Sequence, residues 1–262
     1  MSTIDQLLEE ASSVPVEGWD FTRLGVRIST KPGPWNFEQI VIEHVRDAAD
    51  LLDMGTGGGE WLALLPYRPS RTVATEAWPP NVDVARARLR PLGISVVSVE
   101  GAPDNAGQQP DEKRGRLPFP TASFDLVSNR HDSFLASEVA RVLTPGGTFL
   151  TQQTGGNYGE FYDALELSHP SRPALEWSLS LAAEQIRTAG LSIADSAEGA
   201  EETTFADVGA LAWYLRAIPW VVEGFSVDTH RPQLERLDER IRSEGPIRFR
   251  QPSFWLKAIK PE

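Results

Sequence analysis

The sequence contains no cysteine among its 262 residues, and it has only four histidines and two methionines. The absence of cysteine excludes disulfides, thiolate zinc sites and cysteine nucleophiles. The four histidines are scattered and form no HxxxH-type pair, so we expect no structural metal site.

Long apolar runs are also missing. No stretch approaches the roughly 18 apolar residues of a membrane-spanning helix. The acidic N-terminal stretch MSTIDQLLEEASS lacks the basic and then apolar layout of a signal peptide. We therefore expect a cytoplasmic protein with no membrane partner, and the sequence leaves the oligomeric state open.

Basic charge is scarcer than acidic charge, and the formal net charge is −12. Proteins that grip RNA through its phosphates usually present a basic face, so this balance argues against a nucleic acid partner. One local exception lies at 231–260, where eight basic residues accompany four acidic ones. A solvated helix followed by a strand explains this segment, and a basic patch is the alternative.

The middle of the chain alternates strands with helices. Apolar patterns and turn residues predict strands at 49–54, 72–76, 94–100, 123–129 and 148–154, and helices at 37–48, 58–65, 81–90 and 134–143. Such alternation predicts βαβ units and a largely parallel sheet covered on both faces. The length suits one large domain.

The pattern loosens on both sides of this region. We expect helices over 2–12, 173–189, 206–218 and 231–243, and strands over 191–199 and 248–259. Residues 14–36 hold prolines, glycines and two tryptophans without a clear period. Because flexible linkers rarely contain tryptophan, an ordered loop is the interpretation.

The stretch LLDMGTGGGEWLALL, residues 51–65, is an apolar run, a glycine loop and a helix start. A phosphate-binding P-loop needs GxxxxGK[ST], but Glu60 stands five places after Gly55 and no lysine is near. A dinucleotide loop needs a third glycine where Glu60 stands, and an acid there opposes a pyrophosphate bound at the helix start. Asp53 and Glu60 instead favour a cofactor with a cationic part.

Five segments in a fixed order resemble a known family. DMGTGGGE at 53–60 resembles motif I of the class I S-adenosylmethionine-dependent methyltransferases. The second strand ends in VATEA, whose acid Glu76 stands where the family binds ribose hydroxyls. The third strand ends in VEGA at 99–102, which resembles the family's turn under adenine. LPFPTASFDLV at 117–127 and EVARVLTPGGTFL at 138–150 resemble the type 11 subgroup. The resemblance covers about 49–155 strongly and the rest weakly.

The resemblance implies an α/β, Rossmann-like methyltransferase fold. In that fold a mostly parallel seven-stranded sheet has its last strand antiparallel and helices on both faces, and here a helical insertion at about 205–244 separates the sixth and seventh strands. We expect one domain over 1–262, with an N-terminal cap at 1–48, a cofactor-binding core at 49–155 and a substrate-side half at 156–262.

The implied cofactor is S-adenosylmethionine. The residues that match the family's cofactor contacts are Asp53, Met54, Gly55, Thr56, Gly57, Glu60, Glu76, Ala77, Glu100, Gly101, Ala102 and Asn129. The chain departs from the family after the third strand, where Pro103 and an insertion follow Ala102. Backbone contacts from Gly101 and Ala102 are therefore favoured over a side-chain bond from Asp104.

An oxygen or amine acceptor would need a general base. His131 is the best-placed candidate, because it lies just past the fourth strand and ligands in open α/β sheets bind beyond the carboxyl ends of strands. The alternative is that His131 caps the following helix or lies over the cofactor.

Tryptophan is plentiful outside the predicted sheet, which suits a closed apolar pocket. This favours a small, partly hydrophobic acceptor. RNA or another macromolecule is the alternative acceptor, and a cofactor-binding protein without catalysis is the alternative class. Candidate acceptor contacts are Trp35, Asn157, Tyr158, Trp213 and Tyr214, with Trp19 in a possible further wall.

Overall fold

The computed structural model of the protein describes residues 3–16, 21–102, 105–107, 114–171 and 173–262. Trp19 and Asp104, both considered from the sequence, lie outside these residues. The chain forms two compact units. Unit 1 comprises Met1–Gly33, Asn157–Ser171 and Ala200–Gln251, and unit 2 comprises Pro34–Gly156, Arg172–Gly199 and Pro252–Glu262. The expectation of a single domain stays a prediction.

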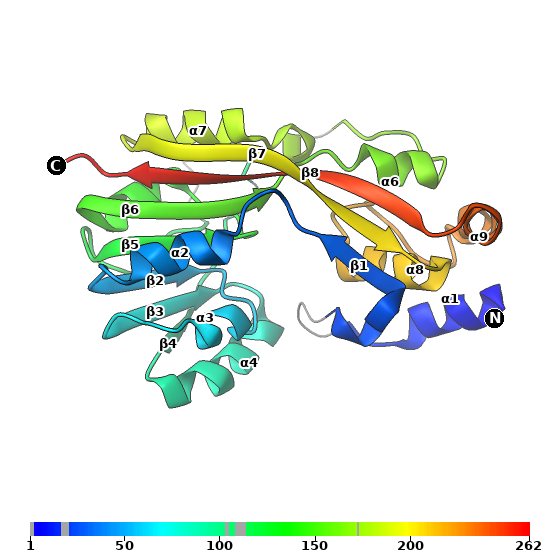
Figure 1. Ribbon diagram of the computed structural model, residues 1–262, viewed down its shortest axis with the longest axis horizontal. Helices are drawn as coiled ribbons and strands as arrows, with labels where there is room; N and C mark the ends of the chain where they lie inside the picture. Colours follow the sequence, from blue (N-terminus) through cyan, green and yellow to red (C-terminus); the bar gives the residue numbers. More distant parts are fainter. Residues whose placement is uncertain (1–2, 17–20, 103–104, 108–113, 172) are drawn as a thin grey trace. The chain divides into compact units, whose positions relative to one another are not determined.

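The sheet of unit 2 matches the predicted fold (Figure 1). Its strands lie in the order β7–β8–β6–β5–β2–β3–β4. The pairs among β2, β3, β4, β5 and β6 are parallel, whereas β8 runs antiparallel to β6. The bounds are β2 (Asp50–Met54), β3 (Arg71–Glu76), β4 (Ser95–Ser98), β5 (Phe124–Arg130), β6 (Leu143–Thr154), β7 (Ser192–Phe205) and β8 (Ile247–Ile259). The predicted mostly parallel sheet with an antiparallel last strand is confirmed.

Helices cover both faces of this sheet. One apolar cluster joins Leu51 to α2 (Phe37–Val45), α3 (Glu60–Leu64) and α4 (Pro79–Leu89). A second joins Leu52 to α5 (Ala136–Val142) and α7 (Leu179–Thr188). Successive residues of a strand point to opposite faces, so this neighbouring pair of fully buried leucines anchors both layers. Short 3₁₀ turns lie at Arg90–Leu92 and Pro173–Glu176.

Local sequence signals set the helix boundaries. The Asn36 side chain accepts the backbone N–H of Gln39 at 3.0 Å, which is the N-cap predicted for α2. Pro79 and Pro80 occupy the first turn of α4, where a missing N–H breaks no intrahelical bond.

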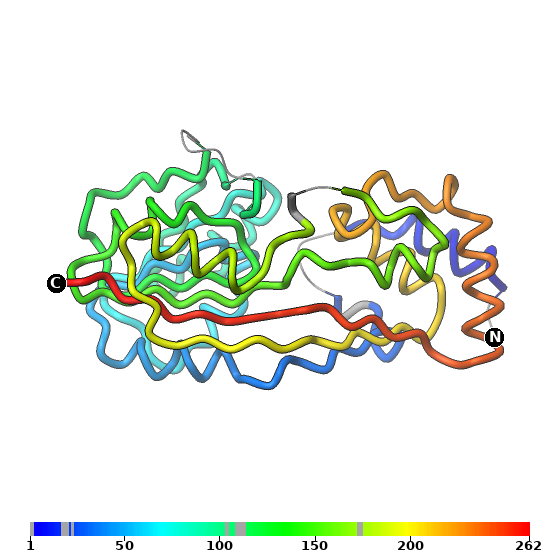
Figure 2. Tube along the Cα trace, turned by 90° about the horizontal axis from the view of Figure 1, so that it is seen from above, coloured from blue at the N-terminus to red at the C-terminus, as the bar shows by residue number. Residues whose placement is uncertain are grey.

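Unit 1 is built from α1 (Ile4–Ser13), a 3₁₀ segment (Thr22–Arg27), β1 (Ile28–Lys31), α6 (Gly159–Ala164), α8 (Val208–Ala217) and α9 (Arg231–Glu244), with parts of β7 and β8. The traces of β7 and β8, yellow and red in Figure 2, lie side by side, and each strand contributes residues to both units. The two helices expected between the last two strands are α8 and α9.

Strand β1 makes the sheet eight-stranded rather than seven-stranded over the described residues. It falls in the segment 14–36, for which an ordered loop was expected. Ile28 to Lys31 pair antiparallel with Phe205 to Glu202, beyond the predicted end of β7 at residue 199. A four-residue strand with mostly exposed side chains shows no alternation of its own, so only its partner reveals it.

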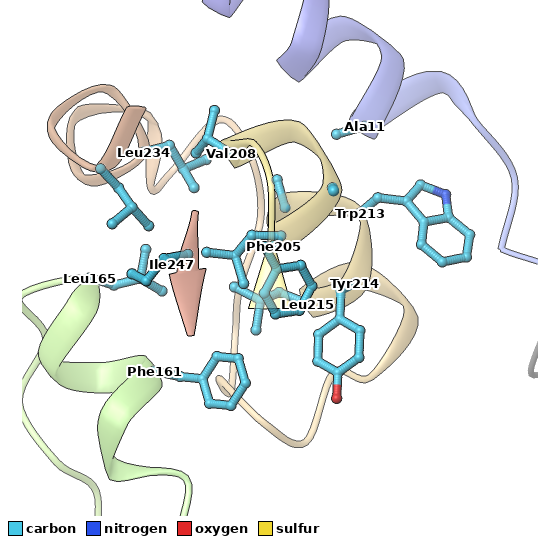
Figure 3. Close-up of a cluster of buried hydrophobic side chains, with 14 of the residues drawn as sticks. Ala11, Phe161, Leu165, Phe205, Val208, Trp213, Tyr214, Leu215, Leu234 and Ile247 are labelled. Carbon is cyan, nitrogen blue, oxygen red and sulfur yellow. The ribbon is translucent and has the colours of Figure 1, made fainter. Parts of the chain in front are cut away.

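The core of unit 1 is aromatic. Phe161, Phe205 and Tyr214 gather around the same space near α6, α8 and the start of β8 (Figure 3). Phe161 stacks on Phe249 with ring centroids 4.0 Å apart, and Phe205 meets Tyr214 edge to face at 5.1 Å. Such pairs stabilise beyond simple area burial. Over the described part of the chain, no helix is both long enough and apolar enough to span a bilayer.

Candidate active site

The β2–α3 loop depends on its glycines. Gly55, Gly57 and Gly59 have φ values of 65°, 62° and 77°, a region that residues with a Cβ rarely adopt. The backbone N–H of Thr56 donates to the carbonyl of Thr75 at 3.0 Å, which fastens the loop to β3. The loop is therefore a fixed backbone turn at the carboxyl edge of the sheet.

Glu76, the last residue of β3, holds this loop from the side. Its Oε2 accepts the N–H of Gly57 at 2.7 Å, and its Oε1 accepts the N–H of Trp78 at 2.7 Å. The residue is only 5% exposed, and burial raises the pKa of its carboxyl despite these backbone hydrogen bonds. Each carboxylate oxygen can still accept a further hydrogen bond, such as one from a hydroxyl.

Asp53 lies buried at the carboxyl end of β2. Its Oδ1 accepts the Ser128 hydroxyl at 2.6 Å, while its Oδ2 is buried with no hydrogen-bond partner among the described residues. Burial raises the pKa of Asp53 to about 6, against the effect of the Ser128 hydrogen bond and with that of the Glu76 charge. An unsatisfied buried acceptor of this kind suits a ligand that brings a donor or a positive charge.

Asp132 is the third acid of the site, and no sequence motif singled it out. Its side chain lies over Gly55, where an added Cβ would come within 2.3 Å of the Asp132 Cβ. Burial, followed by the charges of Glu76 and Asp53, raises the pKa of Asp132 above its usual range. Asp53, Glu76 and Asp132 form what we call the carboxylate cluster.

The carboxylate cluster fits S-adenosylmethionine. Like charges held together disfavour ionisation, so a bound cation offsets their repulsion. The cofactor brings a sulfonium, an ammonium and ribose hydroxyls, which match a set of acceptors that includes the unsatisfied Asp53 Oδ2. Asp53, Glu76 and Asp132 would hold it, beside the backbone of Gly55 and Gly57.

Some predicted cofactor residues have other partners. The Glu60 carboxylate pairs with Arg88 at 2.5 Å, so its charge is already neutralised. Glu100 is exposed and lies 3.5 Å from Arg114. The Met54 side chain is buried in the core. Cofactor contacts from these three residues stay predictions.

The loop after β4 lies against the loop after β3. A Cβ added at Gly101 would lie 2.9 Å from the Cβ of Ala77, and one added at Gly115 would lie 2.7 Å from the Cβ of Ala102. The N–H of Gly115 donates to the carbonyl of Glu100 at 2.8 Å. Small residues therefore bring backbone close on both sides of this loop, as the predicted contacts from Ala77, Gly101 and Ala102 require.

Asn129 belongs to a buried polar network on β5 and β6. Its Oδ1 accepts the Thr151 hydroxyl at 2.9 Å and the Gln153 amide at 2.6 Å. Its Nδ2 is buried without a partner among the described residues, which leaves an amide NH₂ group to donate to a ligand. Gln153 and Asn105 extend the network, and Asn105 accepts the N–H of Phe134 at 3.0 Å. The part that Gln153 and Asn105 play in this network is visible only from their tertiary contacts.

His131 follows β5 with a φ of 58°, which is uncommon outside glycine. The residue as a whole is exposed, whereas burial of its ring and the charge of Arg130 lower its pKa to about 4. Its Nε2 lies 3.0 Å from the Gln152 amide nitrogen. Its Nδ1 lies 3.2 Å from the Thr154 hydroxyl. The indole of Trp35 donates to Gln152 Oε1 at 2.8 Å, so the structure joins two predicted residues through one that the sequence did not single out.

The other predicted acceptor residues belong to unit 1. Trp213 is 3% exposed and Tyr214 is 8% exposed, and both pack in its aromatic core. Asn157 is exposed, and its side chain accepts the N–H of Gly159 at the start of α6. Tyr158 is partly buried against the same core. Acceptor contacts from these residues stay predictions.

Solved structures share this fold. The YcgJ protein from Bacillus subtilis is 20% identical with a TM-score of 0.59, over 86% of this chain and 98% of that one. A candidate methyltransferase from Bacillus halodurans is also 20% identical, with a TM-score of 0.58 over 86% and 99%. A chain in the complex of the Haloferax volcanii Trm112 methyltransferase activator with a candidate methyltransferase is 21% identical, with a TM-score of 0.50 over 92% of each.

These likenesses establish the fold, and no curated protein matches the chain. Residues 52–151 match the family described as a methyltransferase domain, and this range contains the glycine loop and all three acids of the carboxylate cluster. The glycine loop suits a sulfonium cofactor. The chain is an S-adenosylmethionine-dependent methyltransferase, and its match to the methyltransferase domain family covers residues 52–151.

Proposed function

We propose that this methyltransferase modifies a small, partly hydrophobic molecule. The observation that carries the proposal is the pairing of the α9 arginines, which lie in the basic segment 231–260. Each arginine of α9 has an acidic partner: Arg231 with Asp5 and Glu235, Arg236 with Glu166, Arg240 with Glu244, and Arg242 with Asp238.

Lys260 is also engaged, because its ammonium donates to the carbonyls of Ala140 and Leu143 at 2.8 and 2.7 Å. Five of the eight basic residues in 231–260 are thus engaged, and the net charge of −12 also disfavours binding to phosphates. RNA is therefore the less favoured acceptor.

The polar and aromatic groups near the carboxyl edge of the sheet suit a small ligand. His131 is exposed there, and the partly buried Trp35 is linked to it through Gln152. Small-molecule sites typically combine apolar and aromatic walls with a few fixed polar groups. We propose that Trp35 and His131 contact the acceptor.

S-adenosylmethionine supplies an electrophilic methyl group when bound. The chain's own residues then bind, orient and exclude water. Asp53, Glu76 and Asp132 provide negative charge and acceptors, and the glycine loop allows close backbone approach. Positioning of an acceptor about 3–3.5 Å from the methyl carbon accounts for much of the rate that such an enzyme achieves.

The test is transfer of a labelled methyl group from S-adenosylmethionine to cell extract separated into small molecules, RNA and protein. The proposal expects label in the small-molecule fraction with the wild-type chain, and much less with Asp53→Asn. Label in RNA or protein instead would overturn the small-molecule assignment. Cofactor binding without label in any fraction would favour a binding protein that lacks catalysis.

A further inference from the structure

A chain of hydrogen bonds in unit 2 links a tryptophan to the exposed histidine. Trp35 Nε1 lies 2.8 Å from Gln152 Oε1, Gln152 Nε2 lies 3.0 Å from His131 Nε2, and His131 Nδ1 lies 3.2 Å from Thr154 Oγ1. In addition, the backbone N–H of His131 donates to the carbonyl of Gln152 at 2.9 Å. Gln152 therefore holds both the backbone and the ring of His131.

Trp35, at the start of this series of hydrogen bonds, sets the donor and the acceptor of each bond that follows. An indole N–H can only donate, so Gln152 Oε1 must accept from Trp35. The amide NH₂ of Gln152 then faces His131, and because it can only donate, His131 Nε2 must carry the lone pair. The proton of the neutral imidazole therefore resides on Nδ1, where the Thr154 hydroxyl can accept it.

The arrangement also disfavours a charged ring. An imidazolium carries a proton on each nitrogen, so its Nε2–H would oppose the N–H of the Gln152 amide. The amide cannot simply turn over, because its oxygen is engaged by Trp35.

Gln152 is well placed to impose this state. It is 4% exposed and lies on β6 beside Arg130, the last residue of β5. His131 itself is exposed and has a left-handed backbone conformation that its N–H bond to Gln152 helps to hold. A buried residue thus fixes the orientation of the His131 ring, and uncommon backbone at such a point is typical of functional sites.

We propose that Gln152 and Trp35 are positioning residues that hold His131 as the neutral Nδ1–H tautomer, so that His131 offers the methyl acceptor a hydrogen-bond donor rather than the lone pair of a base. The second part rests on the proposed function, since it places an acceptor at His131. The acceptor that fits is a nucleophile already deprotonated at neutral pH, such as a carboxylate or an acidic phenol.

No proton has to be removed from such an acceptor. Its lone pair forms the new bond to the methyl carbon, while the carbon–sulfur bond breaks and its electron pair stays on sulfur. The anionic nucleophile and the cationic sulfonium become two uncharged centres. The Nδ1–H of His131 can orient the oxygen by sharing the place of the Thr154 hydroxyl.

Nitrogen NMR of the histidine rings in the full chain, without any ligand, tests the tautomer. His131→Gln assigns the signal among the four histidines. The wild type should show a protonated Nδ1 and a lone pair on Nε2. In Gln152→Glu the carboxylate can only accept, so Nε2 should gain a proton and the titration midpoint of His131 should rise by at least about one pH unit.

Trp35→Phe is a second variant, in case the buried Gln152 substitution does not fold. Loss of the indole N–H frees the amide to turn over, so a mixture of tautomers should appear. Trp61→Phe is its matched control, because Trp61 packs against the same apolar cluster as Trp35 but lies outside the hydrogen-bond chain. A wild-type ring protonated on Nε2, or one that Gln152→Glu leaves unchanged, would overturn the positioning role.

The donor role has its own readout. In the labelled-methyl assay on the small-molecule fraction, His131→Gln retains an N–H donor and should transfer label at least about ten-fold faster than His131→Ala. Equal loss in both variants would overturn the donor role of His131. If no small molecule takes label, the proposed function and this donor role fail, while the NMR result still decides the tautomer independently.

Discussion

The side chain of Asp132 lies over Gly55 so closely that a Cβ on Gly55 would meet the Asp132 Cβ at 2.3 Å. The two residues come from different turns, one after β2 and one after β5, and they bring an acid directly onto the glycine loop. Two features therefore disfavour a side chain at residue 55: the contact with Asp132 and the left-handed backbone conformation.

Gly55→Ala should therefore lower the free energy of unfolding by more than the left-handed backbone conformation alone explains. A left-handed residue with a Cβ costs roughly 1–2 kcal/mol, and the collision with Asp132 adds to it. Gly93→Ala is the matched control, because its φ is 74° and an added Cβ would meet no described atom within 4 Å. Denaturant unfolding should show a larger loss for Gly55→Ala than for Gly93→Ala.

The same collision predicts coupling between the two positions. In an Asp132→Gly background, Gly55→Ala should cost only about what Gly93→Ala costs, since both the clashing Cβ and the carboxyl group are gone. Equal costs of Gly55→Ala in both backgrounds would mean that the contact has no energetic weight.

Glu76→Gln should weaken S-adenosylmethionine binding by roughly 1.5–3 kcal/mol, which is the range for a hydrogen bond to a charged group. The amide keeps the size of the side chain but removes the negative charge and one of two acceptors. Calorimetric titration measures the change. Asp83→Asn is the control, because that side chain on the neighbouring α4 is 90% exposed.

Glu60→Gln should weaken cofactor binding much less than Glu76→Gln, because Arg88 already neutralises Glu60. Calorimetric losses of similar size in the two variants would show that Glu60 contacts the cofactor directly, as the sequence pattern suggested.

The raised pKa of Asp53 predicts how stability depends on pH. The folded state binds the proton of this carboxyl more tightly than the unfolded chain, so stability falls as pH rises through the window between the two pKa values. For a pKa raised from 3.8 to about 6, the fall between those pH values is up to about 3 kcal/mol.

Asp53→Asn should remove this part of the pH dependence. The measurement is the free energy of unfolding of both chains, without cofactor, across that window. Groups with lowered pKa values, such as Glu138, make stability rise with pH instead. Their contribution is the same in wild type and variant, so it cancels when the two curves are subtracted. Parallel curves for wild type and variant would exclude a raised pKa for Asp53.

Asp207 links two elements of unit 1. Its carboxylate accepts Nε and one Nη of Arg27 at 2.7 and 2.8 Å, and it caps α8 by accepting the N–H of Ala210 at 2.9 Å. Asp207→Ala should destabilise the protein by about 2–4 kcal/mol, since the cap and a partly buried ion pair are both lost. Asp207→Asn keeps a cap and should cost less. Thermal unfolding followed by circular dichroism compares them.

The sequence was informative wherever the signal was local. Asp53, the glycine loop and the acid at residue 76 follow from a strand, a turn and the next strand in close succession, and the structure places the loop and both acids together. The parallel sheet follows from the same alternation of short segments. Strand β1 escaped prediction because its four residues carry no pattern apart from their pairing with β7.

What the sequence determined by itself is the fold class and the chemistry of the glycine loop, because both depend on residues near one another along the chain. Only the tertiary structure decided which polar and charged side chains contact one another. It pairs Glu60 with Arg88, brings Asp132 onto Gly55, and joins Trp35 to His131 through Gln152. These contacts join residues 21 to 117 positions apart, so they depend on strand order and packing rather than on any local pattern.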